Sequence, residues 1–437
     1  MADTFRILPV GTTLRIGRTG QQCRIRSFMD SGSQGAVYEV DVDGERFALK
    51  WYHSMIARDE RLRERVRRAV ERGAPDNRFL WPLAAVEAGG GFGYLMNLRP
   101  SGCVKFTRLF SSRASDRVIL PLRDRAAVGA EIAEAFFSLH AKGLCYQDIN
   151  FGAIFLDPQR LSVLICDNDN VDVDGQPATV AGTPRFMAPE IVRGDAQPSA
   201  DTDLHSLAVL LFYLVFFHHP LDDLTAASRP VFARTDELEV FGEHPSFVFA
   251  PDVDVAELER HGLGPQRRLW GELAERTQQL FIRAFDAGLN APRARVIETE
   301  WIEALRDLRD SCIACDSCGF EIPWKKSSGQ AGDCCWCGAR LQASPRLQIG
   351  GAHIVLAPGA RIYGSRLGLP SAQLNNGVAG VVEGDHSEIQ LRNLTSATWS
   401  IRCRDGRVRA ASPDSSVALA VGDVLEFGGL KLGTVEI

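Results

Sequence analysis

The stretch Gly182-Thr183-Pro184-Arg185-Phe186-Met187-Ala188-Pro189-Glu190 is the most specific pattern in this sequence. It precedes the nearly all-apolar segment from Ser206 to Phe217, which we expect to form a helix buried in the centre of a domain. On its N-terminal side, the apolar run Leu164-Ile165-Cys166 ends in Asp167, and Asp148 lies earlier in the chain. The stretch therefore marks the middle of a domain in which two aspartates precede a buried helix.

A glycine-containing turn and a strand lysine lie farther toward the N-terminus. The turn Gly32-Ser33-Gln34-Gly35 lies between two predicted strands, and its small residues would let backbone N–H groups close over phosphate oxygens. Asp30 stands where such a loop usually has its first glycine, so the loop is imperfect. Lys50 follows in the apolar strand Phe47-Ala48-Leu49-Lys50. Glycine loop, lysine and two aspartates thus occur in the order that phosphoryl transfer requires.

On these motifs, residues 20–310 resemble Hanks-type protein kinases. More narrowly, Lys50-Trp51-Tyr52-His53, Phe79-Leu80-Trp81-Pro82-Leu83 and Ile165-Cys166-Asp167-Asn168-Asp169-Asn170 look like a bacterial subgroup. That subgroup is associated with a metal-dependent phosphatase and a von Willebrand A protein in tellurite-resistance-related systems. The resemblance implies ATP as donor, Mg²⁺ or Mn²⁺ as metal, and Ser or Thr of a protein substrate as acceptor. It also implies the phosphatase and the von Willebrand A protein as partners.

The resemblance assigns a role to each motif residue. Lys50 would hold the α- and β-phosphates, Asp167 would bind Mg²⁺, and Asp148 would accept the proton of the substrate hydroxyl. Glu64, on a predicted helix from Arg58 to Arg72, is the best candidate to pair with Lys50. The nucleotide site would further include Gly32, Ser33, Gln34, Gly35, Val37, Ala48, Met96, Asn97 and Leu98.

Three positions depart from the family pattern. Ala153 stands where kinases place the asparagine that binds a second Mg²⁺, and alanine has no ligand atom. Gln147 replaces the arginine that commonly pairs with a phosphate on the activation loop. Asn168 and Asp169 replace the usual Phe-Gly after Asp167. We hypothesise that Asp169 or Asn168 compensates for Ala153, which predicts a stronger dependence on Mn²⁺ or on high Mg²⁺.

Three functions remain open at this point. Retention of Lys50, Asp148 and Asp167 favours an active serine/threonine kinase. Ala153 favours a pseudokinase scaffold that binds nucleotide and signals by conformation. A kinase-fold enzyme that uses ATP differently is the third, and the Ala188-Pro189-Glu190 run argues against small-molecule phosphorylation.

The sequence also predicts two supporting contacts inside the domain. Arg295 belongs to a late motif whose arginine pairs with the glutamate of the Ala-Pro-Glu run, so we expect a buried Glu190–Arg295 pair. Asp203, at the start of the buried helix, should hold the backbone of the loop that carries Asp148. Whether Thr179 or Thr183 is phosphorylated stays open.

Two Cys-x-x-Cys-Gly knuckles follow the kinase-like region. Cys315, Cys318, Cys334 and Cys337 have the spacing at which four thiolates meet one Zn²⁺ tetrahedrally, as in a zinc ribbon. Cys312 and Cys335 are left out of the site. Four cysteines close the coordination shell, so the predicted role of Zn²⁺ is structural.

Short alternating runs and frequent turns after Arg346 predict an all-β sandwich. Parts of it resemble forkhead-associated domains, which bind phosphothreonine: His386-Ser387-Glu388-Ile389, Leu391 to Ser396 and Gly422 to Gly428. Gly364-Ser365 lacks the usual arginine directly after glycine, so we expect a protein-contact or substrate-docking surface here.

Composition bounds the remaining properties. The 437 residues carry a net charge of −6, with 45% hydrophobic and 24% charged residues, so we expect a globular protein without a nucleic-acid partner. No apolar run is long enough to cross a bilayer and Met1 to Arg18 lacks a signal-peptide core, so we expect a cytoplasmic protein without a membrane anchor. Six of eleven cysteines lie between Cys312 and Cys337, which favours a metal site over disulfides.

The expected fold is multidomain α+β. A bilobal protein-kinase-like domain would span residues 1–310, a zinc ribbon 311–345 and a β-sandwich 346–437. In the small lobe we expect the helix named above and five strands, at Cys23 to Met29, Ala36 to Val42, Arg46 to Tyr52, Leu80 to Glu87 and Tyr94 to Leu98. In the large lobe we expect helices at Ala126 to Ala141, Ser206 to Phe217, Leu269 to Phe285 and Glu298 to Leu308.

Overall fold

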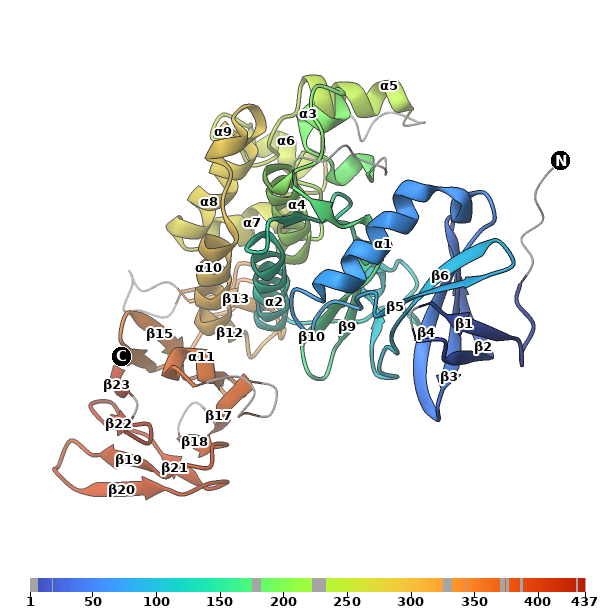
Figure 1. Ribbon diagram of the computed structural model, residues 1–437. Helices are drawn as coiled ribbons and strands as arrows, with labels where there is room; N and C mark the ends of the chain where they lie inside the picture. Colours follow the sequence, from blue (N-terminus) through green and yellow to red (C-terminus); the bar gives the residue numbers. More distant parts are fainter. Residues whose placement is uncertain are drawn as a thin grey trace.

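The computed structural model describes residues 7–17, 19–174, 182–221, 233–324, 332–342, 344–369, 374, 377–385, 388–429 and 431–436 (Figure 1). Thr179, His386 and Ser387 lie outside these described residues. Among the helices described, none combines the length and the apolarity that a membrane span requires.

The N-terminal part is a closed six-stranded barrel with one long helix against it, drawn in blue in Figure 1. Its strands pair in the order β1-β2-β3-β4-β6-β5, and β5 closes on β1. They are β1 (Thr13–Ile16), β2 (Gln22–Ser31), β3 (Gly35–Val42), β4 (Glu45–Tyr52), β5 (Ala84–Ala88) and β6 (Gly91–Asn97). The sequence missed the short strand β1. It also began the strand predicted from Leu80 to Glu87 too early, because Leu80 instead donates its N–H to Ile165 in the following lobe.

Helix α1 (Glu60–Arg72) begins two residues later than predicted. Asp59 caps it by accepting hydrogen bonds from the Arg61 and Leu62 N–H groups. Gly73 ends it with a positive φ of 72° and ψ of 168°, a backbone conformation that glycine adopts readily. The helix buries Leu62, Arg65, Val66 and Ala69, a stripe at positions i, i+3, i+4 and i+7.

The second part is mostly helical and shares one large core. The buried helix α4 (Ala200–Phe216) lies against α2 (Leu122–His140), and α10 (Glu298–Ser311) also packs on α2. The single helix predicted from Leu269 to Phe285 is wrong. It is divided into α7 (Gly264–Glu272) and α8 (Glu275–Phe285), because Leu273 and Ala274 adopt extended backbone angles and Leu273 is buried.

The remaining elements of this part are short. They are β7 (Val104–Lys105), β8 (Leu144–Cys145), β9 (Ile154–Asp157), β10 (Ser162–Ile165), β11 (Asp172–Val173), α3 (Pro189–Val192), α5 (Arg234–Glu237), α6 (Val255–Arg260) and α9 (Ala287–Asn290). Strands β9 and β10 pair antiparallel, and β10 delivers the chain to Asp167.

The C-terminal part is built from β-strands and has its own core around Trp399. Strands β12 (Cys312–Ala314) and β13 (Glu321–Pro323) form a two-stranded sheet that follows α10 directly. A six-stranded sheet has the order β15-β14-β23-β22-β19-β20, and a four-stranded sheet has the order β16-β17-β18-β21. Their elements are β14 (Arg346–Ile349), β15 (Ala352–Val355), β16 (Arg361–Tyr363), α11 (Gly364–Leu367), β17 (Val378–Gly384), β18 (Ile389–Asn393), β19 (Trp399–Arg402), β20 (Val408–Ala411), β21 (Ser416–Ala418), β22 (Val424–Glu426) and β23 (Leu432–Glu436).

Charged contacts join the C-terminal part to the helical part. Arg123 of α2 pairs with Glu321 at 2.9 Å and donates to the Cys312 carbonyl at 3.0 Å. Arg366 of α11 reaches Asp310 and Asp307 of α10 at 2.6 and 2.7 Å. Arg366 lies one residue after Ser365, the position at which forkhead-associated domains usually have an arginine. Because Arg366 contacts these two carboxylates, it faces the helical part of the same chain.

Candidate nucleotide and metal sites

A pocket of about 500 Å³ lies between the barrel and the helical part. Lys50 of β4, Asp148 and Asp167 all line it. The predicted nucleotide-site residues Gly32, Ser33, Gln34, Gly35, Val37, Ala48, Met96 and Asn97 line it as well. Leu98 and Glu64 are not among its lining residues. The structure therefore gathers side chains from distant parts of the sequence around one cavity.

The glycine turn above the pocket is held by backbone contacts. The Gly32 N–H donates to the Gly35 carbonyl at 2.9 Å, and the His53 N–H donates to the Gln34 carbonyl at 2.9 Å. At Gly35 a Cβ atom would lie only 2.4 Å from the Trp51 carbonyl oxygen, so glycine is required by the close approach of β4.

Lys50 is the centre of the charge arrangement in the pocket. Its side chain is only 8% exposed. Its Nζ lies 2.9 Å from both Asp169 carboxylate oxygens, 3.1 Å from Asp167 and 3.3 Å from Gln34. Burial alone would lower the pKa of Lys50, but Asp169 and Asp167 outweigh it and raise that pKa. Lys50 therefore stays protonated.

The predicted Lys50–Glu64 pair is wrong. The Glu64 side chain is 61% exposed and its carboxylate lies 3.9 Å from Arg67, one turn along the same helix. The register of α1 turns Arg65 inward instead, and Arg65 is 4% exposed. The physical reason is the buried stripe described above, which includes position 65 and leaves position 64 in solvent.

The predicted compensation for Ala153 by Asp169 is contradicted by its contacts, whereas compensation by Asn168 stays a prediction. Asn168 and Asp169 are buried, with exposed fractions of 0% and 1%. The Asp169 carboxylate accepts hydrogen bonds from Lys50, from Tyr52 at 2.6 Å and from Tyr94 at 3.1 Å, so it is not free to bind a metal ion. Asn168 donates to the Ile165 carbonyl at 2.9 Å.

Asp167 keeps an accessible carboxylate. Its side chain is 48% exposed, and its backbone adopts a left-handed φ of 54°, an uncommon conformation for a residue other than glycine. Its carboxylate contacts Lys50 at the pocket, and a carboxylate oxygen is the ligand type that Mg²⁺ prefers. Asp167 and the phosphates of a nucleotide would therefore be the ligands of a magnesium ion here.

Asp148 contacts Thr183, near the start of the stretch from Gly182 to Glu190. Its Oδ1 accepts hydrogen bonds from the N–H and the hydroxyl of Thr183, both at 2.9 Å. Asn150 does not substitute for the missing asparagine, because its side-chain oxygen Oδ1 accepts a hydrogen bond from the Gly152 N–H at 2.7 Å.

A buried network holds the loop that carries Asp148. Asp203 accepts hydrogen bonds from the N–H groups of Tyr146 and Gln147, as the sequence predicts. His140 lies between Asp203, at 3.1 Å, and Glu298. Burial opposes the charge on His140, but hydrogen bonds to both carboxylates raise its pKa to about 9.

The predicted Glu190–Arg295 pair is confirmed. Two parallel hydrogen bonds of 2.8 Å join the guanidinium to the carboxylate, and both residues are buried. Arg295 also donates to the carbonyls of Gly288 and Asp201. The pair ties the Ala188-Pro189-Glu190 run to the helical core.

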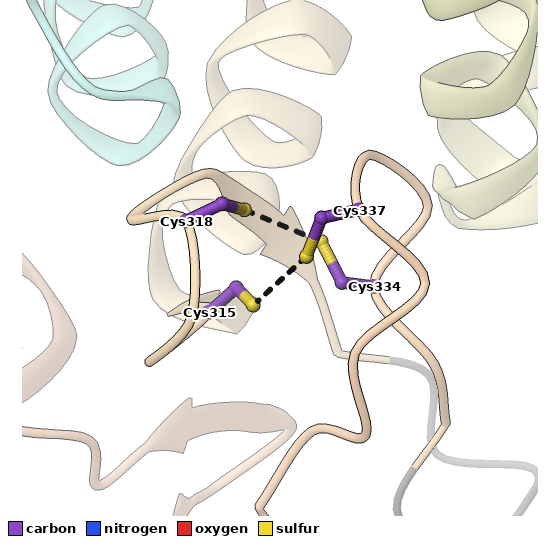
Figure 2. Close-up of side chains that lie close together, drawn as sticks. All are labelled: Cys315, Cys318, Cys334 and Cys337. Atoms are coloured by element: carbon purple, nitrogen blue, oxygen red, sulfur yellow. Dashed lines mark hydrogen bonds between the residues drawn. The ribbon is translucent and has the colours of Figure 1, made fainter.

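The four predicted cysteine ligands converge in space (Figure 2). Their sulfur atoms lie within 4.8 Å of one another, and the pairs Cys315–Cys337 and Cys318–Cys334 lie at 3.7 and 3.8 Å. A tetrahedral site with Zn–S bonds of about 2.3 Å requires sulfur atoms about 3.8 Å apart. The donor set and its spacing therefore fit Zn²⁺.

The two knuckles have the same local structure. Gly319 and Gly338 adopt φ of 72° and 74°, and each donates its N–H to the carbonyl of the first cysteine in its knuckle. Glycine is needed at both positions for the left-handed turn, because it adopts a positive φ without strain. Cys335 lies outside the cluster and accepts a hydrogen bond from Arg268 at its carbonyl.

Comparison with known proteins agrees with the motifs. Residues 102–244 match the family model of the protein kinase domain. The CBL-interacting protein kinase 4 of Oryza sativa subsp. japonica is 32% identical over 126 residues, which are 28% of this chain and 28% of that protein. A probable serine/threonine-protein kinase, CCRP1 of Zea mays, is 28% identical over 113 residues, 25% of this chain and 18% of that protein.

This chain spans less than a third of the length of either relative. Among solved structures, the PknI kinase domain of Mycobacterium tuberculosis aligns with a TM-score of 0.46 and 19% identity, over 69% of this chain and 99% of that chain. The family-model match and the serine/threonine kinase relatives support a protein kinase domain of the Hanks type in this chain.

Proposed function

We propose that this protein is an ATP-dependent serine/threonine protein kinase of bacterial signalling, which transfers a phosphoryl group to a protein hydroxyl. The observation that carries the proposal is the pocket in which Lys50, Asp148 and Asp167 meet beneath the glycine turn. The kinase-domain match over residues 102–244 supports it.

Each of these three residues has a distinct task in the proposed reaction. Lys50 binds phosphate oxygens as a permanent cation. A magnesium ion, when bound, neutralises the charge that develops on the phosphates, and Asp167 is the carboxylate that would hold it. Asp148 orients the acceptor hydroxyl and takes its proton. The Thr183 hydroxyl, 2.9 Å from Asp148, marks a position from which a hydroxyl reaches this carboxylate.

A pseudokinase scaffold is the second candidate. It is favoured by Ala153, which is buried and supplies no ligand atom at the position of the second-metal asparagine. Within the residues described, neither Asp169 nor Asn150 is free to replace it. In this alternative the pocket binds nucleotide, and the docked C-terminal part presents the signal to partners.

The other parts of the chain would support signalling. The cysteine cluster would hold a structural Zn²⁺, and the C-terminal sheets would form a surface for substrate or partner proteins. A cognate metal-dependent phosphatase and a von Willebrand A protein are the proposed partners, in the cytoplasm. These assignments rest on the sequence resemblance and on the cluster geometry.

Phosphate transfer from labelled ATP to a generic basic acceptor tests the proposal. The assay compares the wild type with Asp148→Asn, in Mg²⁺ and in Mn²⁺. We expect transfer by the wild type that disappears in the variant. If neither metal supports transfer but ATP still raises the melting temperature, the kinase proposal is rejected and the pseudokinase scaffold is accepted.

A further inference from the structure

Three side chains on two neighbouring strands converge on the Asp169 carboxylate. Lys50 and Tyr52 are two residues apart on β4, so they project from the same face of the sheet. Tyr94 of β6 lies directly opposite Lys50 in the strand register. The Lys50 ammonium and the two tyrosine hydroxyls lie 2.6 to 3.1 Å from the carboxylate oxygens. The barrel therefore provides a preformed cradle for one negative charge.

Helix α1 does not provide that charge. The side chains of Glu60 and Glu64 are 77% and 61% exposed, and both pair with arginines of their own helix. The charged residue that α1 buries is Arg65. The charged side chain on the buried face of α1 is thus a cation, and the anion that meets Lys50 comes from the segment after β10.

We propose that Asp169 is the positioning residue that holds Lys50 ready for the nucleotide phosphates, in place of a glutamate from α1. The inference rests on the proposed nucleotide site and goes beyond it. Its carboxylate is completely buried and its oxygens are satisfied by one cation and two hydroxyls, which is the condition under which a buried charge is stable.

The other two partners of Lys50 differ in accessibility. Asp167 is 48% exposed, and Gln34 belongs to the glycine turn that lines the pocket. These two contacts can be exchanged for phosphate oxygens when nucleotide enters, whereas the Asp169 contact is inaccessible to solvent. Lys50 therefore has one permanent partner and two exchangeable ones.

The contact differs in composition from one between Lys50 and a helix glutamate. It lies between the barrel and the segment adjoining Asp167, and α1 supplies none of its polar atoms. Helix α1 packs beside it, because Leu62 and Val66 share a core with Tyr52 and Tyr94. Helix α1 therefore supports the contact by packing and not by charge.

Matched carboxylate-to-amide variants test the assignment. Asp169→Asn removes the charge inside the cradle, and Glu64→Gln makes the same chemical change on α1. ATP affinity is measured by calorimetry on the full chain, and kcat and KM for ATP are measured where transfer is detected. We expect Asp169→Asn to weaken ATP binding and raise KM by about tenfold or more, the effect of losing a charge-assisted hydrogen bond. We expect Glu64→Gln to match the wild type.

A second variant keeps the test valid if Asp169→Asn does not fold. The double variant Tyr52→Phe, Tyr94→Phe keeps both charges and removes only the two hydroxyls, and we expect weaker ATP binding from it too. Wild-type affinity in Asp169→Asn or in the double variant would overturn the inference, as would a loss in Glu64→Gln. ATP affinity tests the role of Asp169 even if the wild type transfers no phosphate. Phosphate transfer tests the proposed kinase activity, so the two proposals can fail independently.

Discussion

The buried histidine behind the Asp148 loop should make stability depend on pH in a defined direction. His140 contacts Asp203 and Glu298, and these contacts raise its pKa from 6.5 to about 9. A folded-state pKa above the unfolded value means that the stabilisation is fully present below about pH 6.5 and is lost as the pH rises through about 9. The difference between the two pKa values corresponds to about 3 kcal/mol.

Replacement by His140→Gln removes the titrating group and keeps a hydrogen-bond donor. We expect the stability advantage of the wild type over this variant to fall by about 3 kcal/mol between pH 6 and pH 10. Urea unfolding at several pH values measures the difference. The exposed His261, replaced by Gln, provides the matched control for the substitution itself.

Direct titration can refute the reasoning without relying on stability. In labelled-histidine NMR spectra, the resonance that is missing from His140→Gln should titrate near pH 9 in the wild type. His219 is a useful contrast, because burial lowers its pKa to about 3. A His140 resonance that titrates near 6.5, or a stability advantage that does not change with pH, would show that His140 is not held as a cation between the two carboxylates.

Three further results are expected. Breaking the buried pair with Glu190→Gln or Arg295→Met should destabilise the protein by roughly 3–5 kcal/mol, and an unchanged unfolding midpoint would contradict this. Elemental analysis should find one Zn²⁺ per chain, and Cys337→Ser should abolish it and lower the melting temperature; full zinc content in that variant would refute the cluster. Ala153→Asn should raise transfer at limiting Mg²⁺ by about tenfold or more, whereas an unchanged rate would show that a second metal ligand is not limiting.

Much of the site could be predicted because its residues lie in short local motifs. Lys50, Asp148 and Asp167 each follow an apolar segment, and the structure places all three around one pocket. The Glu190–Arg295 pair and the role of Asp203 also followed from motif order. The Zn²⁺ ion itself stays a prediction.

The face of α1 could not be chosen reliably from the sequence. Leu62, Val66 and Val70 have the i, i+4, i+8 spacing of a buried stripe, but Val70 is only half-buried, and Arg65 and Ala69 are buried with the first two. The helix contains many arginines, and a hydrophobicity pattern cannot predict which of them is buried. The role of Asp169 was only weakly indicated by the sequence. Strand alternation predicts that Lys50 and Tyr52 project from the same face of β4, where both can contact one acidic group.

The most direct test of the central claim is to identify the group that the protein transfers. The wild type and Asp148→Asn are incubated with ATP and Mg²⁺, and the acceptor protein and the chain itself are analysed by mass spectrometry. The account predicts phosphoserine or phosphothreonine with the wild type and none with the variant. Bound ATP without any modified residue, or a nucleotidyl group attached in place of phosphate, would contradict it.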